Sequence, residues 1–215
     1  GKGAVIEKDN HVHAYEGVAG GSTYEKLGFV RHKRKNAWWI VTKKQDESFV
    51  AYLFDENGLD PNGVTSDVEG NSIGYISFSP NGTRMATGKG IYQFNPKTGR
   101  VKKLLASFPF SPFPIVSMLA ISPNGDFVYC AQGQQVFQID IRNIKNNNAQ
   151  LEKVEVAEYT RETELHAFML APNGKIYINT DDGKYLSTIH KPNQKGMACD
   201  VELKAVKLGQ IEDGG

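Results

Sequence analysis

The chain has 215 residues, with 25 Lys and Arg against 24 Asp and Glu, so its formal net charge is +1. A near-neutral chain has no electrostatic bias toward nucleic acid or an anionic membrane surface, and neither partner is expected. Hydrophobic residues make up 40% of the chain without any run that could cross a bilayer, and aromatic residues reach 10%, so residues 1–215 are expected to form a single folded domain with one core and no membrane insertion.

The first predicted element, residues 4–17, stands outside the repeat that organises the rest of the chain. It is either the tail of an earlier repeat or a strand that completes the last one. His11 and His13 would project from one face of this strand, as two metal ligands would. No third ligand is evident, and an exposed strand face is favoured over a metal site.

The next predicted unit covers residues 26–68. The polar run at 32–36 forms its first turn, and Trp38 and Trp39 follow on a strand, where adjacent side chains point to opposite faces. One Trp is expected in the core, and the other is free to stack on a sugar, contact a protein or pack on a neighbouring strand layer. The tetrapeptide at 60–63, Asp-Pro-Asn-Gly, is interpreted as a chance turn between the third and fourth strands.

The unit at residues 73–108 contains Ser-Pro-Asn-Gly at 79–82, and this tetrapeptide recurs at 122–125 and, with Ala first, at 171–174. Alternating apolar residues precede each copy and a second apolar run follows it. Pro presets φ, and Asn-Gly tolerates the positive φ of tight connections. Each copy therefore predicts a β-hairpin. A phosphate-binding loop is excluded because a strand, and not a helix, follows the glycine.

The two remaining units are predicted at residues 115–160 and 164–209. A third strand closes on Asp55, Asn95 and Asp140 in successive units, 40 and 45 residues apart, and these side chains are expected to open the next turn by bonding to backbone. A fourth strand follows in each unit. Four short antiparallel strands per period of roughly 40 to 45 residues predict an all-β fold, a WD40-like β-propeller with about four to five visible blades, possibly within a larger ring.

Several segments resemble one family in a consistent order. They are RHKRKNAWWIVTKKQDESFVAYLFDENGL, GYISFSPNGTRMA, IYQFN, LAPNGKIYI and YLSTIHKPNQKGMACDVE, which together span about residues 25–205. They are similar to the propeller region of large secreted or surface proteins of Bacteroidetes. Such proteins often carry immunoglobulin-like repeats and a C-terminal sorting domain for type IX secretion, of the gliding-motility-associated kind. The resemblance implies a propeller that is secreted or held at the outer membrane surface, and it supplies no catalytic residues.

Two residues are predicted to face a ligand. His166 lies at the start of an innermost strand, where the other units carry Gly74 and Ser117, so a titratable side chain stands at the mouth of the central channel. Tyr75 lies one residue further along the equivalent strand and would border the same entrance. A histidine bonded to neighbouring backbone, and a tyrosine packed between blades, are the structural alternatives.

The other candidate residues give weaker indications of a functional site. Asp181-Asp182-Gly183 is typical of a hairpin turn, and the basic run at 31–35 of a solvated loop, with an anionic glycan or acidic partner as the alternative. Cys130 and Cys199 match no metal or redox spacing, and isolated thiols are favoured over one disulfide. No cofactor and no metal are expected.

The leading hypothesis is a noncatalytic extracellular module that binds a protein or a glycan through its loops. A propeller enzyme of the lactonase, lyase or glycosidase class, with its site at the channel mouth, is the first alternative. An intracellular WD-type scaffold is the second. The oligomeric state is left open.

Overall fold

The computed structural model describes residues 27–43, 48–68, 75–110, 118–144, 151–161 and 163–209. In these ranges the chain consists of β-strands and one short 3-10 helix, η1 (Gly196–Cys199), and none of them contains a helix long and apolar enough to cross a membrane. The predicted strand at residues 4–17, with His11 and His13, lies outside the described residues.

The strands form four antiparallel sheets, called blades 1 to 4 below. In blade 1 the order is β1-β2-β3-β4, and β5 also pairs with β3. Blades 2, 3 and 4 have the orders β6-β7-β8-β9, β10-β11-β12-β13 and β14-β15-β16-β17. The prediction of a propeller with four-stranded antiparallel blades is confirmed, and the described residues form four of them.

The strand bounds follow the repeat closely. Blade 1 contains β1 (Leu27–Arg31), β2 (Trp38–Lys43), β3 (Phe49–Asp55), β4 (Gly58–Leu59) and β5 (Val64–Ser66), and blade 2 contains β6 (Ser77–Phe78), β7 (Arg84–Thr87), β8 (Gly90–Asn95) and β9 (Arg100–Ser107). Blade 3 contains β10 (Leu119–Ile121), β11 (Phe127–Gln132), β12 (Gln135–Asp140) and β13 (Lys153–Glu158). Blade 4 contains β14 (Leu165–Leu170), β15 (Ile176–Thr180), β16 (Tyr185–Ile189) and β17 (Val201–Lys207). Each sheet thus falls inside one predicted repeat unit.

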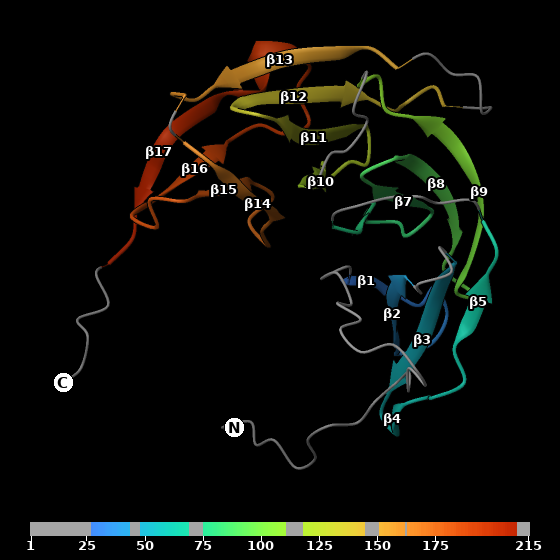
Figure 1. The fold of residues 1–215 in the computed structure, drawn as a ribbon. Helices are drawn as coiled ribbons and strands as arrows, with labels where there is room; N and C mark the ends of the chain where they lie inside the picture. Colours follow the sequence, from blue (N-terminus) through green and yellow to red (C-terminus); the bar gives the residue numbers. More distant parts are fainter. Residues whose placement is uncertain are drawn as a thin grey trace, which may run out of the picture.

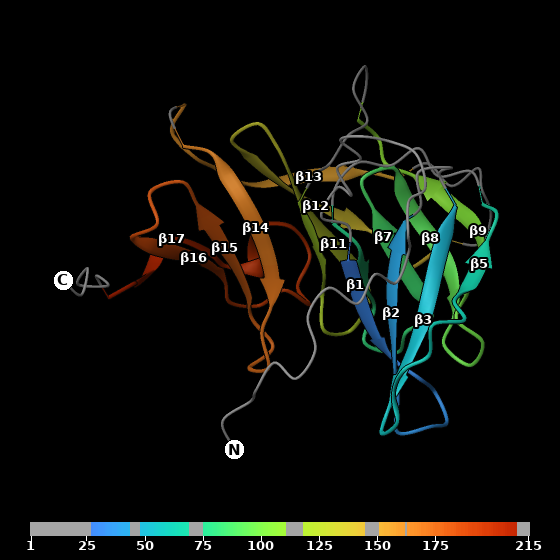
Figure 2. The same cartoon turned by 60° about the horizontal axis from the view of Figure 1, so that its bottom comes forward.

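The blades follow one another around an arc, with blade 1 in blue and cyan at one end and blade 4 in orange and red at the other (Figure 1). The strands β1, β10 and β14 lie on the inner side of the arc, and β9, β13 and β17 lie on its outer side. Inner strands touch in chain order, β1 against β6, β6 against β10 and β10 against β14. Turning the molecule shows the same separation of blades 1 and 4 (Figure 2).

The hydrophobic core is divided among the contacts between blades. One cluster joins blades 1 and 2 around Trp39, Phe49 and Tyr92, a second joins blades 2 and 3, and a third joins blades 3 and 4. A sheet that alternates side chains between two buried faces must pack on a neighbour at each side. The expectation of a single core is therefore wrong: the described residues form three hydrophobic layers, one between each pair of neighbouring blades.

The Pro-Asn-Gly turns take the predicted conformation. Gly82, Gly125 and Gly174 have φ of +68°, +76° and +77°, which a Cβ would disfavour. In each turn the Asn side-chain Oδ1 accepts a hydrogen bond from the backbone N–H two residues later, at 3.0 to 3.1 Å. In blade 1 His32 replaces the Ser, and its Nδ1 accepts the N–H groups of Arg34 and Lys35 at 3.0 and 2.9 Å.

The turns after the third strands also form as predicted. The Oδ1 atoms of Asp55, Asn95 and Asp140 accept the backbone N–H two residues further on, at 2.8, 3.0 and 3.1 Å. The tetrapeptide at 60–63 lies between β4 and β5, in the link to the last strand of blade 1, and not at a hairpin of the repeat. It is therefore not a further copy of the hairpin turn, and the link between the third and fourth strands, where it was predicted, is instead the turn that begins at Asp55.

Candidate functional site

The two predicted ligand-facing residues lie on blades 4 and 2, which blade 3 separates. His166 is the second residue of β14, at an irregularity in its pairing with β15, and its side chain is exposed. Tyr75 lies two residues before β6 and is 39% exposed. No hydrogen bond or ion pair joins either side chain to another residue that the structure describes. Their contact with a ligand stays a prediction.

The other singled-out residues have structural roles. Trp39 is buried and its Nε1 donates a hydrogen bond to the carbonyl oxygen of Pro96 in blade 2 at 3.1 Å, whereas Trp38 is 48% exposed. The prediction that the two indoles lie on opposite faces is confirmed. In the Asp-Asp-Gly turn, Asp182 Oδ1 accepts the N–H of Lys184 at 3.1 Å, as a hairpin turn requires.

Cys130 and Cys199 are free thiols buried in different layers, between blades 2 and 3 and between blades 3 and 4. Burial raises the pKa of both thiols because it penalises the charged thiolate. They are structural residues, as the sequence favoured, and not a disulfide.

A pocket of about 260 Å³ opens between blades 1 and 2, and three lysines line it. We call it the lysine pocket; its lining residues are Lys33, Thr83, Gln93, Phe94, Asn95, Pro96, Lys97 and Lys102. None of these is acidic, and none of the three lysines pairs with a carboxylate among the described residues. The pocket thus combines cationic groups with the amide and hydroxyl groups of Gln93, Asn95 and Thr83.

Hydrogen bonds between the two blades hold the pocket's backbone. The N–H of Lys33 donates to the carbonyl oxygen of Pro96 at 3.0 Å, and His32 Nε2 donates to the carbonyl oxygen of Lys97 at 3.1 Å. The imidazole of His32 stacks obliquely on Trp39, with ring centroids 5.7 Å apart. The basic turn of blade 1 is therefore fastened against the basic turn of blade 2, although 65 residues separate His32 from Lys97.

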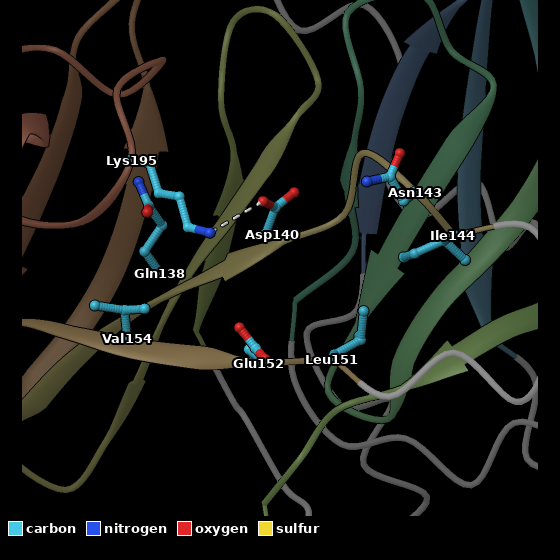
Figure 3. A pocket seen from close by; sticks show the side chains of 8 residues that line it. All are labelled: Gln138, Asp140, Asn143, Ile144, Leu151, Glu152, Val154 and Lys195. Carbon is cyan, nitrogen blue, oxygen red and sulfur yellow. Dashed lines mark ion pairs between the residues drawn. The ribbon is translucent and has the colours of Figure 1, made fainter.

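A second pocket, of about 180 Å³, lies beside β12 and β13 of blade 3 (Figure 3). We call it the carboxylate pocket; its lining residues are Gln138, Asp140, Asn143, Ile144, Leu151, Glu152, Val154 and Lys195. Lys195 comes from blade 4, and its Nζ lies 3.8 Å from an oxygen of Asp140.

Asp140 is held ionised by its neighbours. Hydrogen bonds from the side chain of Arg142 are the main cause that lowers the pKa of this carboxyl, and Lys195 adds to the effect. A lowered pKa suits a hydrogen-bond acceptor and does not suit a general acid, which needs a proton near neutral pH. Within the described residues no three His, Cys, Asp or Glu side chains form a group that could hold a metal ion.

Comparisons with known proteins support the fold alone. No protein family and no curated protein matches the chain. Many solved structures share the fold. One, from Bacteroides fragilis and named a "putative 6-phosphogluconolactonase", is 14% identical with a TM-score of 0.50, and the match covers 75% of this chain and 52% of that one.

Two further solved structures come from Bacteroides thetaiotaomicron. A protein of unknown function is 10% identical with a TM-score of 0.50, and the match covers 79% of this chain and 42% of the other. The extracellular domain of a one-component system is 14% identical with a TM-score of 0.47, over 79% and 21% of the two chains. This chain spans about half or less of the length of each, and the likeness shows the propeller fold alone.

Sequence reasoning named the basic run at 31–35 but did not connect it to Lys97 and Lys102. The run was interpreted as a solvated loop, because a turn is normally surrounded by water. The repeat could have indicated this neighbour, since Lys97 lies just after the third strand of the next unit and so occupies a turn, as the basic run does. Only the packing of one blade against the next brings the two turns together.

Proposed function

We propose that this chain is a noncatalytic binding module whose lysine pocket recognises an anionic glycan. The convergence of three lysines on one pocket, without an acidic lining residue, is the observation that supports it. Ammonium groups bind carboxylate or sulfate groups of a sugar chain, and Thr83, Gln93 and Asn95 offer hydrogen bonds to its hydroxyls. A pocket whose backbone is already fixed loses little conformational entropy on binding.

The proposal is tested by calorimetry with polygalacturonate and chondroitin sulfate as anionic glycans, and dextran as the neutral comparison. Binding of an anionic glycan that weakens as salt rises is expected, because exposed charge pairs are screened. In the double variant Lys97→Gln and Lys102→Gln, losing two charge-assisted bonds raises the Kd by about tenfold or more.

Lys207→Gln is the matched control, because Lys207 is an exposed lysine at the end of β17, far along the chain from the pocket. This variant retains the wild-type Kd. Equal loss of affinity in the control and the double variant, or equal binding of dextran, contradicts the proposal. Binding of poly-glutamate but of neither glycan redirects it to an acidic protein ligand.

We further propose that the module works outside the cell, secreted or at the outer membrane surface, in a protein of the type IX secretion kind. The ordered sequence resemblance to surface proteins of Bacteroidetes supports this location. Protease treatment of intact cells carrying the full-length protein tests it. Loss of the propeller from intact cells is expected, and protection until lysis would favour an intracellular scaffold.

An enzyme of the lactonase, lyase or glycosidase class is the second candidate, and the observation that favours it is that two carboxylates, Asp140 and Glu152, line one pocket. A solved neighbour of similar fold carries a lactonase name, which concerns that protein. Two assays test this candidate: acid release from lactones in a pH-stat, and release of the coloured aglycone from chromogenic glycosides, followed by absorbance. Turnover that Asp140→Asn and Glu152→Gln both abolish would establish it against the binding module.

A further inference from the structure

The face of blade 1 turned away from blade 2 carries three exposed aromatic side chains, whereas Val50 and Tyr52 on the same face are buried. Phe29, Trp38 and Phe54 on this face are 55%, 48% and 46% exposed. Trp38 pairs with Phe54 across β2 and β3, so their side chains lie next to each other. The alternate residues point to blade 2. A Cβ at position 28 would lie within 3 Å of Ile76 and Phe78, for example.

The strand pairing identifies the equivalent positions in the other blades. The last residue of each inner strand pairs with one residue of the second strand, and this partner is Trp38 in blade 1 and Met85, Val128 and Ile176 in blades 2, 3 and 4. In the third strand, Phe54 corresponds by the same pairing to Tyr92, Ile139 and Ile189. Phe29 corresponds to Ile76, Leu119 and Phe168, two residues before the end of the inner strand.

All nine equivalents are at most 9% exposed, because the preceding blade covers them. In blade 1 the same three positions carry large aromatic side chains that are about half exposed. A soluble surface seldom gathers several large apolar side chains without a partner. The face of blade 1 that is turned away from blade 2 therefore resembles, in these three positions, the faces by which the other blades contact their neighbours.

Blade 4 has the complementary open face. Tyr177 occupies the position of Trp39 and Tyr129, and Met169, paired with it, is 67% exposed. In blades 1 and 3 this position donates a hydrogen bond to the next blade. Trp39 Nε1 donates to Pro96 O at 3.1 Å, and Tyr129 Oη donates to Pro192 O at 3.0 Å.

Tyr177 keeps this capacity. Its hydroxyl oxygen accepts a bond from Asn173 Nδ2 at 2.9 Å, which leaves the hydroxyl hydrogen available to donate. The acceptors Pro96 and Pro192 both lie in connections between third and fourth strands, and blade 1 has such a connection between β3 and β4. One chain thus presents both surfaces of a contact between blades, one on blade 1 and the other on blade 4.

We propose that two copies of this chain close one ring, the open face of blade 4 in each copy docking on the open face of blade 1 in the other. Two such contacts are related by a two-fold axis, and four blades from each copy give an eight-bladed ring. The proposal is independent of the glycan pocket.

Docking of blade 1 on blade 1 does not reproduce the interior contacts. There, a large side chain meets a small residue of the preceding blade, as Ile76 and Phe78 meet Gly28. If two exposed faces of blade 1 met, large Phe and Trp side chains would meet each other. Neither face would offer a small residue or the aromatic hydrogen-bond donor that the interior contacts use. The contact between blades 4 and 1 supplies both, with Ala167 and Tyr177 on the blade 4 side.

The experiment is sedimentation velocity on the full chain and on two variants, Trp38→Glu in the blade 1 face and Met169→Lys in the blade 4 face. Both side chains are exposed in the single chain, so neither change should prevent folding, which circular dichroism checks. The wild type is expected to sediment as a dimer and each variant as a monomer, a loss of at least tenfold in association. Met197→Lys is the matched control, because Met197 is 73% exposed in η1, outside both faces, and this variant stays dimeric.

Mixing the two variants is the decisive step. The mixture restores one native contact, from Met169 of the first variant to Trp38 of the second, and places opposite charges in the other contact. Mixed dimers are therefore expected. A monomeric wild type, a dimeric Met169→Lys variant or a mixture that stays monomeric would each overturn the proposal, and the first result would leave the face to blades of a longer chain.

Discussion

Gly99 shows how a single residue couples a turn to the contact between two blades. Its φ is +72°, and a Cβ there would lie 2.8 Å from the ring of Trp39. The same indole stacks near His32 and bonds to Pro96, so the turn after β8 is held from blade 1. A glycine that the sequence marks only as a turn residue is also a packing position.

Replacing Gly99 by Ala should destabilise the protein more than the same change at Gly133. Both residues have positive φ, +72° and +58°, so the backbone cost of about 1 kcal/mol is shared. A Cβ at Gly133 would meet nothing within 4 Å, whereas at Gly99 it overlaps the indole and adds about 1–3 kcal/mol. Urea denaturation of both variants measures the difference, and equal midpoints would contradict the packing role.

Among the elements, the hairpin turns explain where the second strand of a blade begins. The Oγ of Ser122 accepts the N–H groups of Asp126 and Phe127 at 3.2 and 3.0 Å and donates to Asn124 Oδ1 at 2.8 Å. This one hydroxyl satisfies the backbone at the start of β11, which is buried. The Ser of the repeat therefore has a structural role in the turn.

Ser122→Ala should lower the free energy of unfolding by about 1–3 kcal/mol, because it leaves the buried N–H of Phe127 without its acceptor. Ser107→Ala, at the exposed end of β9, is the control and should stay within about 0.5 kcal/mol of the wild type. Chemical denaturation followed by circular dichroism compares them. A neutral Ser122→Ala variant would show that the hydroxyl is dispensable to the turn.

At the scale of the whole molecule, stability depends on layers between neighbouring blades and not on one central core. Each layer buries side chains from two sheets, and such repeat proteins are stabilised by contacts between neighbours. Cys130 and Cys199 lie in different layers, which makes them reporters of separate contacts.

Neither thiol should react with Ellman's reagent in the native protein, because both are buried and burial raises their pKa. Both are expected to become reactive at one urea concentration, the midpoint seen by circular dichroism, if the blades unfold together. The single variants Cys130→Ala and Cys199→Ala assign the signals. A thiol that reacts at low urea would show that its layer opens first.

Much of the fold can be predicted from short stretches of the sequence. Alternating apolar residues, three Pro-Asn-Gly copies and the Asp or Asn that ends three of the third strands specify most strands and turns of the described blades, because each depends on contacts within one unit. The candidate site could be predicted from the sequence only in part. The sequence placed His166 and Tyr75 on inner strands, but it gave no means to join the basic turn of blade 1 to Lys97.

The repeat, and with it the four-stranded blade and the register of its turns, can be predicted from the amino-acid order alone. The packing of the blades is needed to show that Trp39 is buried and Trp38 exposed, that two basic turns form one pocket, and that blades 1 and 4 are the ends of the described arc. The physical reason is that propeller blades are stabilised by the neighbours on each side. A periodic pattern shows that a face is apolar, and only the packed assembly shows whether another blade covers it.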